Sequence, residues 1–351
     1  MSVNLDFQIN KIKHLVTDSF IQINQLLLDG TVSNSNSNLL NSINKHTKTN
    51  HGKKLRPLLL LLSGNAIYNL QNNKINHQNH IKLAAAIELI HIASLLHDDV
   101  LDNSTIRRNQ QTINAEFDNK CAILAGDFLY AKAFKLISNI DSPQNNQVTS
   151  LIANTSQLMV EGEILQLSEK YNFNIKQDTY LQIITYKTAK LFATTMQLPG
   201  ILNLKTLTSA QLDWNFLAEC GLNLGIAYQL LDDVIDYYKY GNDISEGRIT
   251  LPVIFLLHNS DISTKKNIIQ IINQYPNFAY AQQLEQIHLL KKIIFNNGGF
   301  DYTINLAKHH LILAKTAINV LFGSEYKQAI VQIIDSLLDF KLPNIEDQFK
   351  Q

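Results

Sequence analysis

Two aspartate clusters are the residues of this 351-residue sequence with the clearest potential for chemistry. Asp98 and Asp102 are four residues apart, as are Asp232 and Asp236, and each pair follows an apolar run. Residues four apart lie on one face of a helix, so each pair would present two carboxylates together. The C-terminal end of a helix disfavours anions, so we expect a cation to bind there. Hard oxygen ligands of this kind suit Mg²⁺, which usually shares its shell with substrate phosphates.

Several cationic side chains could bind those phosphates. Lys53, Lys54 and Arg56 come just before the predicted start of a helix at Pro57, where backbone amides also favour an anion. Four further cations follow the first cluster or lie in separate segments: Arg107, Arg108, Lys187 and Arg248. A solvated acidic helix end or a solvated basic turn is the ordinary interpretation of each motif alone. Two acidic clusters after apolar helices favour a shared site instead.

The chemistry that needs both carboxylates and cations is the release of diphosphate. Diphosphate leaves readily only when metal ions and Lys or Arg side chains neutralise its charge. The pattern therefore predicts ionisation of an allylic diphosphate in a cavity that keeps water from the carbocation. One rival is a di-iron bundle, because Glu88 and His91, and Glu285 and His288, have E-x-x-H spacing. That rival, like a purely structural helical adaptor, leaves both aspartate clusters unexplained.

Helical periodicity dominates the chain, and no stretch alternates convincingly with the period of a strand. We predict an amphipathic helix over residues 1–29, a polar loop or a frayed helix over 30–50 and a catalytic core over 51–340, all within a single domain covering 1–351. Core helices are expected at 80–103, 115–140, 148–170, 178–198 and 208–238, and Pro199-Gly200 should end one of them. Gly221 and Gly225 are four apart in the last of these helices, which allows another helix or a ligand to approach closely. The expected fold is an all-α bundle in which two aspartate-bearing helices face each other across a central cavity.

Composition narrows the function further. The 30 basic and 30 acidic residues give a formal net charge of zero, so we expect no nucleic-acid partner. No apolar run comes close to the roughly 18 residues that suggest a membrane span. Cys121 and Cys220 lack any paired spacing, and the N-terminus lacks a secretory or transit pattern. We expect a cytoplasmic protein, or one in the stroma or matrix of an organelle that encodes it.

The motifs together resemble the trans-isoprenyl diphosphate synthases of the long-chain polyprenyl type. The resemblance covers roughly residues 51–340 and is carried, in family order, by HGKKLRP, LLHDDVLDNSTIRRN, AGDFLYAKAF, GEILQL, YKTAKLF, YQLLDDVIDY and GNDISEGRITLPVI. It implies Mg²⁺, a homodimer, and condensation of isopentenyl diphosphate with an allylic diphosphate. Three departures are His51 in place of a usual glycine, Arg248 in place of a usual lysine, and a shorter loop over 238–246.

The resemblance also implies residue roles. The metal ligands would be Asp98, Asp102, Asp232 and Asp236, with Asp99 in support. The allylic diphosphate would contact Arg107, Lys187 and Arg248. The diphosphate of isopentenyl diphosphate would contact Lys53, Arg56, His91 and Arg108. Thr188 and Gln229 would direct polar atoms at the carbocation, and the departing diphosphate itself could accept the final proton.

Two small residues suggest the product length. Ala93 and Ser94 lie one turn before Asp98, where short-chain relatives often have an aromatic residue that blocks growth. Their small side chains predict a product longer than geranylgeranyl, such as an octaprenyl chain for a quinone, released through transient contact with a membrane or a partner enzyme. A short- or medium-chain synthase and a non-catalytic subunit of a heteromeric synthase remain alternatives. A class I terpene cyclase would share the fold but would not need the isopentenyl diphosphate site.

Overall fold

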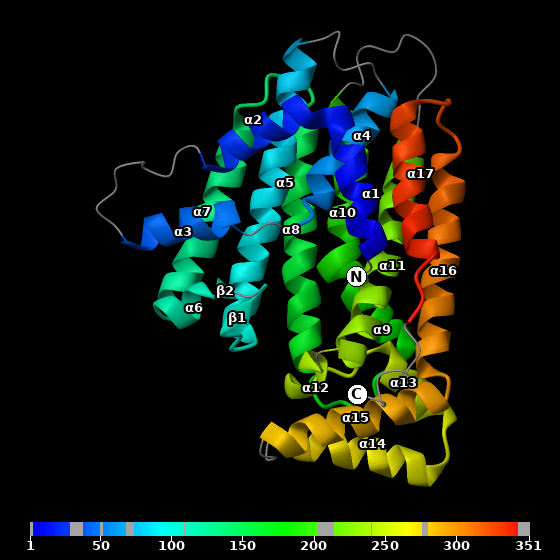
Figure 1. Cartoon of the computed structure of the whole chain (residues 1–351). Helices are drawn as coiled ribbons and strands as arrows, with labels where there is room; N and C mark the ends of the chain where they lie inside the picture. Colours follow the sequence, from blue (N-terminus) through cyan, green and yellow to red (C-terminus); the bar gives the residue numbers. More distant parts are fainter. Residues whose placement is uncertain are drawn as a thin grey trace.

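The computed structural model describes residues 3–28, 38–49, 52–67, 74–108, 110–202, 214–239, 241–275 and 280–342. These residues are almost entirely helical, which confirms the all-α prediction (Figure 1). Their only strands are β1 (Ile106–Arg107) and β2 (Gln110–Gln111), which form a two-residue antiparallel hairpin after the first aspartate cluster. Buried apolar side chains form one hydrophobic cluster that extends from Leu5 to Phe340.

Long helices run side by side through the middle of the molecule and carry the candidate site (Figure 1). They are α4 (Leu55–Ile67), α5 (Lys74–Leu101), α7 (Asn119–Ser138), α8 (Asn145–Ser168), α10 (Lys190–Leu202) and α11 (Asn215–Lys239). Gly221 and Gly225 allow α11 to pack closely on the preceding segment. A Cβ at Gly221 would lie 2.5 Å from the Phe192 carbonyl oxygen, and one at Gly225 would lie 2.6 Å from the Ala189 Cα. The expected close helix approach at these glycines is confirmed.

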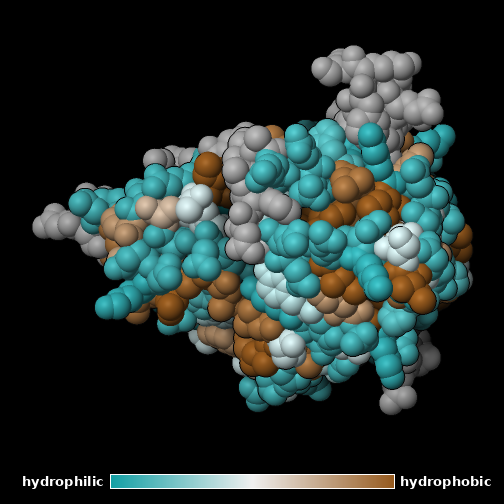
Figure 2. Space-filling model, turned by 90° about the horizontal axis from the view of Figure 1, so that it is seen from below, coloured by the Kyte–Doolittle hydropathy of each residue, from teal (hydrophilic) through white to brown (hydrophobic). Residues whose placement is uncertain are grey.

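The remaining helices surround this central group or lie at its ends. They are α1 (Val3–Ile12), α2 (Thr17–Leu28), α3 (Asn38–Thr49), α6 (Ile113–Glu116), α9 (Gln177–Ile184), α12 (Asn242–Ser245), α13 (Leu251–Asn259), α14 (Ile262–Gln274), α15 (Tyr280–Asn296), α16 (Gly299–Ile318) and α17 (Glu325–Leu338). The pair α14–α15 lies across one end of the bundle. On the face seen from that end, hydrophobic patches are separated by hydrophilic side chains (Figure 2).

The N-terminal region differs from a single helix followed by a loop in two respects, although a helix within 30–50 is one of the two outcomes expected there. A 3₁₀ turn over Lys13–Val16 separates α1 from α2, because α1 packs on α17 whereas α2 packs on α5 and α3. The polar segment 30–50 contains α3, in which Leu39, Leu40 and Ile43 pack against the core. Three apolar residues on one face are enough to hold a helix once tertiary packing supplies a partner surface.

Two further expectations need correction. Pro199 lies inside α10 and does not end it, because Pro199 and Gly200 are both buried and that packing outweighs one lost helical hydrogen bond. The segment His77–Leu101 of α5 is also long and apolar enough by composition to cross a membrane, contrary to the expectation that no run comes close. It is a core helix here, since 72% of its most apolar window is buried.

Candidate active site

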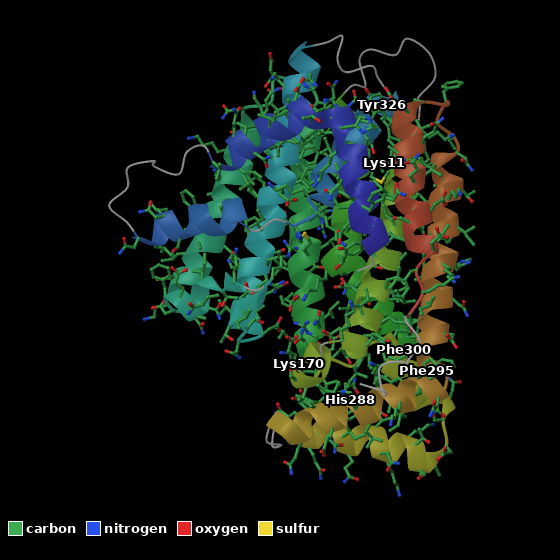
Figure 3. All side chains as sticks on the ribbon, in the orientation of Figure 1. Lys11, Lys170, His288, Phe295, Phe300 and Tyr326 are labelled. Carbon is green, nitrogen blue, oxygen red and sulfur yellow. The ribbon has the colours of Figure 1, made fainter. Side chains whose placement is uncertain are left out.

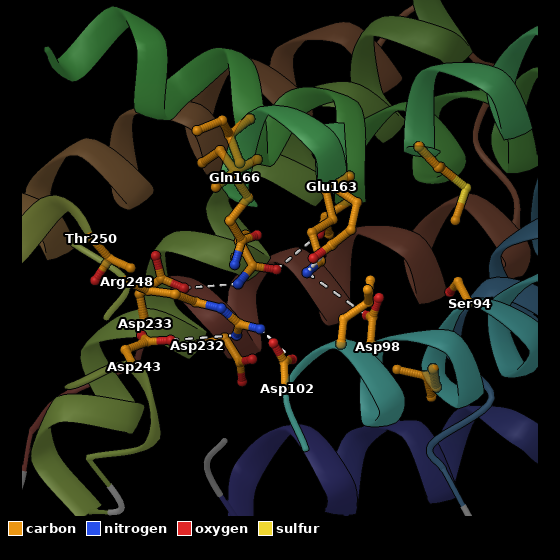
Figure 4. Close-up of a pocket in the computed structure, with 18 of the residues that line it drawn as sticks. Ser94, Asp98, Asp102, Glu163, Gln166, Asp232, Asp233, Asp243, Arg248 and Thr250 are labelled. Carbon is orange, nitrogen blue, oxygen red and sulfur yellow. Dashed lines mark hydrogen bonds and ion pairs between the residues drawn. The ribbon is translucent and has the colours of Figure 1, made fainter. Parts of the chain in front are cut away.

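The two aspartate clusters meet at one cavity of about 480 Å³. We call it the first cavity, and its polar walls come from the end of α5, from α8, from α11 and from the loop between α12 and α13. Asp98 and Asp102 lie on one wall, and Asp232 and Asp233 approach from the other (Figure 4). The helix α5 ends at Leu101, so the first cluster occupies its last turn as the sequence predicts.

Lys187 connects the first aspartate cluster to α8. Its ammonium nitrogen lies 3.8 Å from a carboxylate oxygen of Asp98 and also forms an ion pair with Glu163. Burial raises the pKa of Asp98, and the charge of Lys187 opposes that rise. Sequence reasoning did not assign Glu163, although it lies in the GEILQL motif. A Cβ at Gly162 would lie 2.7 Å from the backbone nitrogen of Lys187, so that glycine is what brings α8 against this segment.

Arg248 is another cation of the first cavity. Its guanidinium group contacts the carboxylate of Asp102, lies 2.7 Å from a carboxylate oxygen of Glu246, and lies 3.7 Å from one of Asp243. Burial raises the pKa of Glu246 to about 7, despite the opposing charge of Arg248. Arg248 therefore crosslinks the α12–α13 loop to the end of α5, 146 residues earlier in the chain. The second oxygen of Asp102 is buried and accepts no hydrogen bond, and it lies 4.0 Å from the ammonium nitrogen of Lys170.

Two aspartates of the clusters have other partners in the structure. Asp99 is buried and accepts a hydrogen bond of 2.7 Å from Nε of Arg107, which places Arg107 at the cavity wall. Asp236 accepts a hydrogen bond of 2.8 Å from the backbone amide of Asp243 and is not among the residues that line the first cavity. The structure thus brings Asp98, Asp102 and Asp232 into the cavity but leaves Asp236 behind them.

A chain of hydrogen bonds orients the polar groups deeper in the first cavity. Tyr180 donates to one oxygen of Asp233 at 2.5 Å, and the amide nitrogen of Gln229 donates to the other at 2.8 Å. The hydroxyl of Thr188 donates to the amide oxygen of Gln229 at 2.9 Å. Burial raises the pKa of Asp233 to about 7. The network therefore fixes which way the Gln229 amide faces.

Lys187 and Thr188 belong to a short π-helical segment, Thr185–Ala189, between α9 and α10. The sequence predicts a continuous α-helix here, so the local geometry differs from the expectation. A π-helical turn inserts an extra residue into a helix and is frequently found at functional sites. Both side chains line the first cavity although they are adjacent in sequence.

A second cavity of about 730 Å³ adjoins the first. Its lining includes all four residues expected to bind isopentenyl diphosphate, namely Lys53, Arg56, His91 and Arg108. Arg56, His91 and Arg108 line both cavities, so the two spaces share a wall. Burial lowers the pKa of His91 well below its usual range, and the two arginines add to this effect. His91 is therefore neutral at pH 7 and can donate a hydrogen bond without carrying charge.

Backbone strain is concentrated around the two cavities. The described residues other than glycine that have positive φ are Lys54, Asn103, Arg108 and Tyr171. Lys54 and Arg108 line the second cavity, Asn103 directly follows the first aspartate cluster, and the ring of Tyr171 lies against Gly247 beside Arg248. Such conformations cost about 1–3 kcal/mol each and persist where surrounding structure enforces them, often at functional sites.

Ala93 and Ser94, whose small side chains are predicted to leave a tunnel open for the growing chain, differ in their placement. Ser94 lines the first cavity, whereas Ala93 is completely buried and is not part of its lining. The same cavity is lined by Tyr130 of α7 and by Met159 and Val160 of α8, none of which sequence reasoning assigned. Their positions depend on how α7 and α8 pack beside α5, which no local sequence signal reveals.

The donor set suits a divalent metal that completes its shell with substrate oxygens. Within the described residues, no group of three or more His, Cys, Asp or Glu side chains is arranged to hold a metal by itself. This excludes a complete di-iron site built from Glu88, His91, Glu285 and His288 in the described part. Carboxylates on two walls, including an oxygen of Asp102 that accepts no hydrogen bond, fit Mg²⁺ that is bound jointly by protein and phosphates.

Comparison with known proteins agrees with this geometry. The family model for polyprenyl synthetase matches residues 37–288. The octaprenyl diphosphate synthase of Haemophilus influenzae is 32% identical over 333 residues, covering 93% of this chain and 95% of that protein. The all-trans-nonaprenyl-diphosphate synthase of Rhodobacter capsulatus is 32% identical over 332 residues, covering 92% of this chain and 95% of that protein.

A solved structure is similar in fold over nearly the whole chain. The polyprenyl synthase of Caulobacter crescentus, complexed with calcium and isoprenyl diphosphate, superposes with a TM-score of 0.83 at 28% identity. The match covers 95% of this chain and 98% of that one. The chain belongs to the polyprenyl synthetase family and is a prenyltransferase of the trans-polyprenyl diphosphate synthase type.

Proposed function

We propose that this protein condenses isopentenyl diphosphate with an allylic diphosphate, in the presence of Mg²⁺, to make a long all-trans polyprenyl diphosphate. We further propose an octaprenyl product that serves as a quinone side chain. The observation that carries the proposal is the pair of adjoining cavities. One has carboxylates on two walls, the other is rich in cations, and Arg56, His91 and Arg108 form the boundary between them.

The first cavity would bind the allylic diphosphate. Lys187 and Arg248 would exchange their carboxylate partners for phosphate oxygens, and Arg107 would contact the diphosphate from the hairpin β1–β2. Asp98, Asp102, Asp232 and Asp236 would hold Mg²⁺, whose positive charge would neutralise the leaving diphosphate. Asp236 joins this set only if its carboxylate leaves the amide of Asp243.

The reaction then breaks the C1–O bond of the allylic substrate, forms one carbon–carbon bond, and finally breaks one C–H bond to restore a double bond. The bond between C1 of the allylic substrate and its diphosphate oxygen breaks, and diphosphate leaves with the electron pair. The double bond of isopentenyl diphosphate, held in the second cavity by Lys53, Arg56, His91 and Arg108, attacks C1. The resulting cation loses a proton to the departed diphosphate. No side-chain base is required.

Thr188 and Gln229 would stabilise positive charge near the breaking bond. Gln229 presents its amide oxygen toward Thr188, while Asp233 and Tyr180 hold the other end of the amide. A preorganised dipole of this kind costs no reorganisation when charge develops. Tyr180 and Asp233 are thus positioning residues for Gln229.

Product length is the finer part of the proposal. The relatives include synthases named for octaprenyl, nonaprenyl and heptaprenyl products. The small side chain of Ser94 leaves the cavity wall open one turn before Asp98, which supports a long product. A short- or medium-chain product would instead require another side chain, such as Tyr130, to close the path.

We also propose a homodimer in the cytoplasm, or in the stroma or matrix of an organelle. Exposed apolar side chains gather on α7 and α8, where Ile123, Leu124, Val160 and Ile164 are 44–61% exposed. Such a patch supports an interface between copies, because large exposed apolar areas are rare on monomers. A long apolar product would also need transient contact with a membrane or a partner enzyme for release.

Sizing of reaction products tests the proposal. The purified protein is incubated with farnesyl diphosphate, isopentenyl diphosphate and Mg²⁺, and the products are measured by mass spectrometry. We expect one dominant product with eight isoprene units and none from Asp98→Asn. A product that stops at geranylgeranyl would refute the chain length but keep the reaction. No condensation by folded protein would favour a subunit that needs a catalytic partner.

A further inference from the structure

The N-terminal helices form one wall of the second cavity. Residues of α1, the 3₁₀ turn and α2 make up part of its lining, together with the basic turn (residues 52–56) and α5. They include Asp6 and Lys13, which no motif of the sequence assigned to a site. Asp6 forms an ion pair of 3.0 Å with Lys53, and Asn24 accepts a hydrogen bond of 2.6 Å from Lys54.

Lys13 directs a cation at the same space. Its ammonium nitrogen lies 5.6 Å from the centroid of the Phe20 ring, and both side chains line the second cavity. Within the described part of the chain, Lys13 forms no ion pair. Its pKa is lowered by burial and then by the nearby charge of Lys54, and Glu88 opposes this. Two ammonium groups that repel each other at a cavity wall would both gain from an anion between them.

The charge of the cavity as a whole favours a multiply charged anion. The cations in its lining are Lys13, Lys53, Lys54, Arg56 and Arg108, and the carboxylates are Asp6 and Glu88. His91 is neutral, so positive charge is in excess. The basic turn and Arg108 are already in contact, because the guanidinium of Arg108 packs over Gly52.

We propose that Lys13 is an additional diphosphate-binding residue of the second cavity. We also propose that Asp6 stays ion-paired with Lys53 until the diphosphate displaces its carboxylate. The identity of the substrate rests on the proposed function, whereas the existence of an anion site in the second cavity does not depend on it. The N-terminal helices would then help set the affinity for isopentenyl diphosphate without touching the allylic substrate. Lys13 and Asp6 should have opposite effects, because one attracts the anion and the other competes with it.

Binding of inorganic pyrophosphate to the full-length protein tests the site directly. Titration calorimetry in EDTA restricts binding to the second cavity, because the metal-free carboxylates of the first cavity repel the anion. We expect Lys13→Met, which keeps the packing on Phe20, to weaken binding about three- to tenfold, as for one charged contact at a partly exposed site. Asp6→Asn should tighten binding, and Lys13→Arg should bind like the wild type.

The control is Lys11→Met, which removes an exposed lysine of α1 (Figure 3). In steady-state assays, Lys13→Met should raise KM for isopentenyl diphosphate by the same factor and leave KM for farnesyl diphosphate unchanged. Equal effects of Lys13→Met and Lys11→Met would overturn the proposal. So would parallel weakening by Lys13→Met and Asp6→Asn, which would indicate only a structural role for α1.

The two proposals can fail separately. Wild-type protein that binds pyrophosphate with these variant effects but condenses no substrate would refute the proposed reaction and leave the anion site standing. Wild-type protein that condenses substrates but binds no pyrophosphate in EDTA would overturn the role of Lys13.

Discussion

Replacement of Arg248 by glutamine should destabilise the metal-free protein and impair the reaction. Arg248 has a side chain that is 17% exposed, and it contacts Asp102, whose side chain is 5% exposed. Removal of one partner from a buried ion pair costs about 3–5 kcal/mol. Because Glu246 can take up a proton near pH 7, part of that cost is relieved, and we expect a loss of about 2–3 kcal/mol in the free energy of unfolding.

Urea denaturation in EDTA, followed by helical circular dichroism, measures this loss. Mg²⁺ should add more stability to Arg248→Gln than to the wild type. The reason is that the metal would neutralise the carboxylates that have lost their cationic partner in the variant. The turnover number should fall about 10²- to 10³-fold, the usual effect of removing one group that stabilises a developing anion. Arg248→Lys keeps the positive charge and introduces the residue that the resemblance implies is usual at this position, so it should retain most of the activity.

Lys239→Gln is the matched control, since Lys239 is an exposed cation at the end of α11. The contrary result is that Arg248→Gln unfolds at the wild-type urea concentration in EDTA and keeps a turnover number within about twofold of the wild type. That result would mean that Arg248 neither offsets the buried carboxylates nor contacts the leaving diphosphate.

Three other predictions follow from the same geometry. Ser94→Phe should shorten the product, as sized by mass spectrometry, and Ala93→Tyr should also shorten it if Ala93 walls the tunnel; unchanged length in both would refute a tunnel at this turn. The pKa of Glu246 is raised from 4.5 to about 7 in the folded protein, so the folded state holds this proton more tightly and stability in EDTA should fall as the pH rises from about 4.5 to about 7. Glu246→Gln should flatten that slope in thermal melts, and an unchanged slope would contradict the assignment. Gly225→Ala should cost about 1–3 kcal/mol in urea denaturation, because its Cβ would lie 2.6 Å from the Ala189 Cα; full stability would show that α11 can move away.

The sequence predicted those parts of the site that depend on local periodicity. Two aspartate pairs with helical spacing, each after an apolar helix, could face a common cavity only from the inner faces of a helical bundle. The glycines of α11 likewise indicated close packing. An α-helix places residues four apart on one face whatever it packs against, so predictions based on this spacing hold in the folded structure.

Other features depend on contacts between distant segments and could not be predicted. The pairing of Arg248 with Asp102, the approach of Glu163 to Lys187, and the reach of Asp6 to Lys53 all require the packed bundle. Predictions that rested on composition or on single residues alone were incomplete or wrong. The polar segment 30–50 contains α3, and Pro199 continues its helix, because tertiary packing outweighed local preference in both places. His51 lies outside the described residues.

A crystal structure with Mn²⁺ and a thio analogue of farnesyl diphosphate would test the central claim most directly. The claim is that the first cavity holds the metal-bound allylic diphosphate between the two aspartate clusters. We predict anomalous peaks for Mn²⁺ between the carboxylates of Asp98 and Asp102 and that of Asp232, with the diphosphate against Lys187 and Arg248. Metal bound elsewhere, or the analogue's diphosphate seated in the second cavity, would contradict the account.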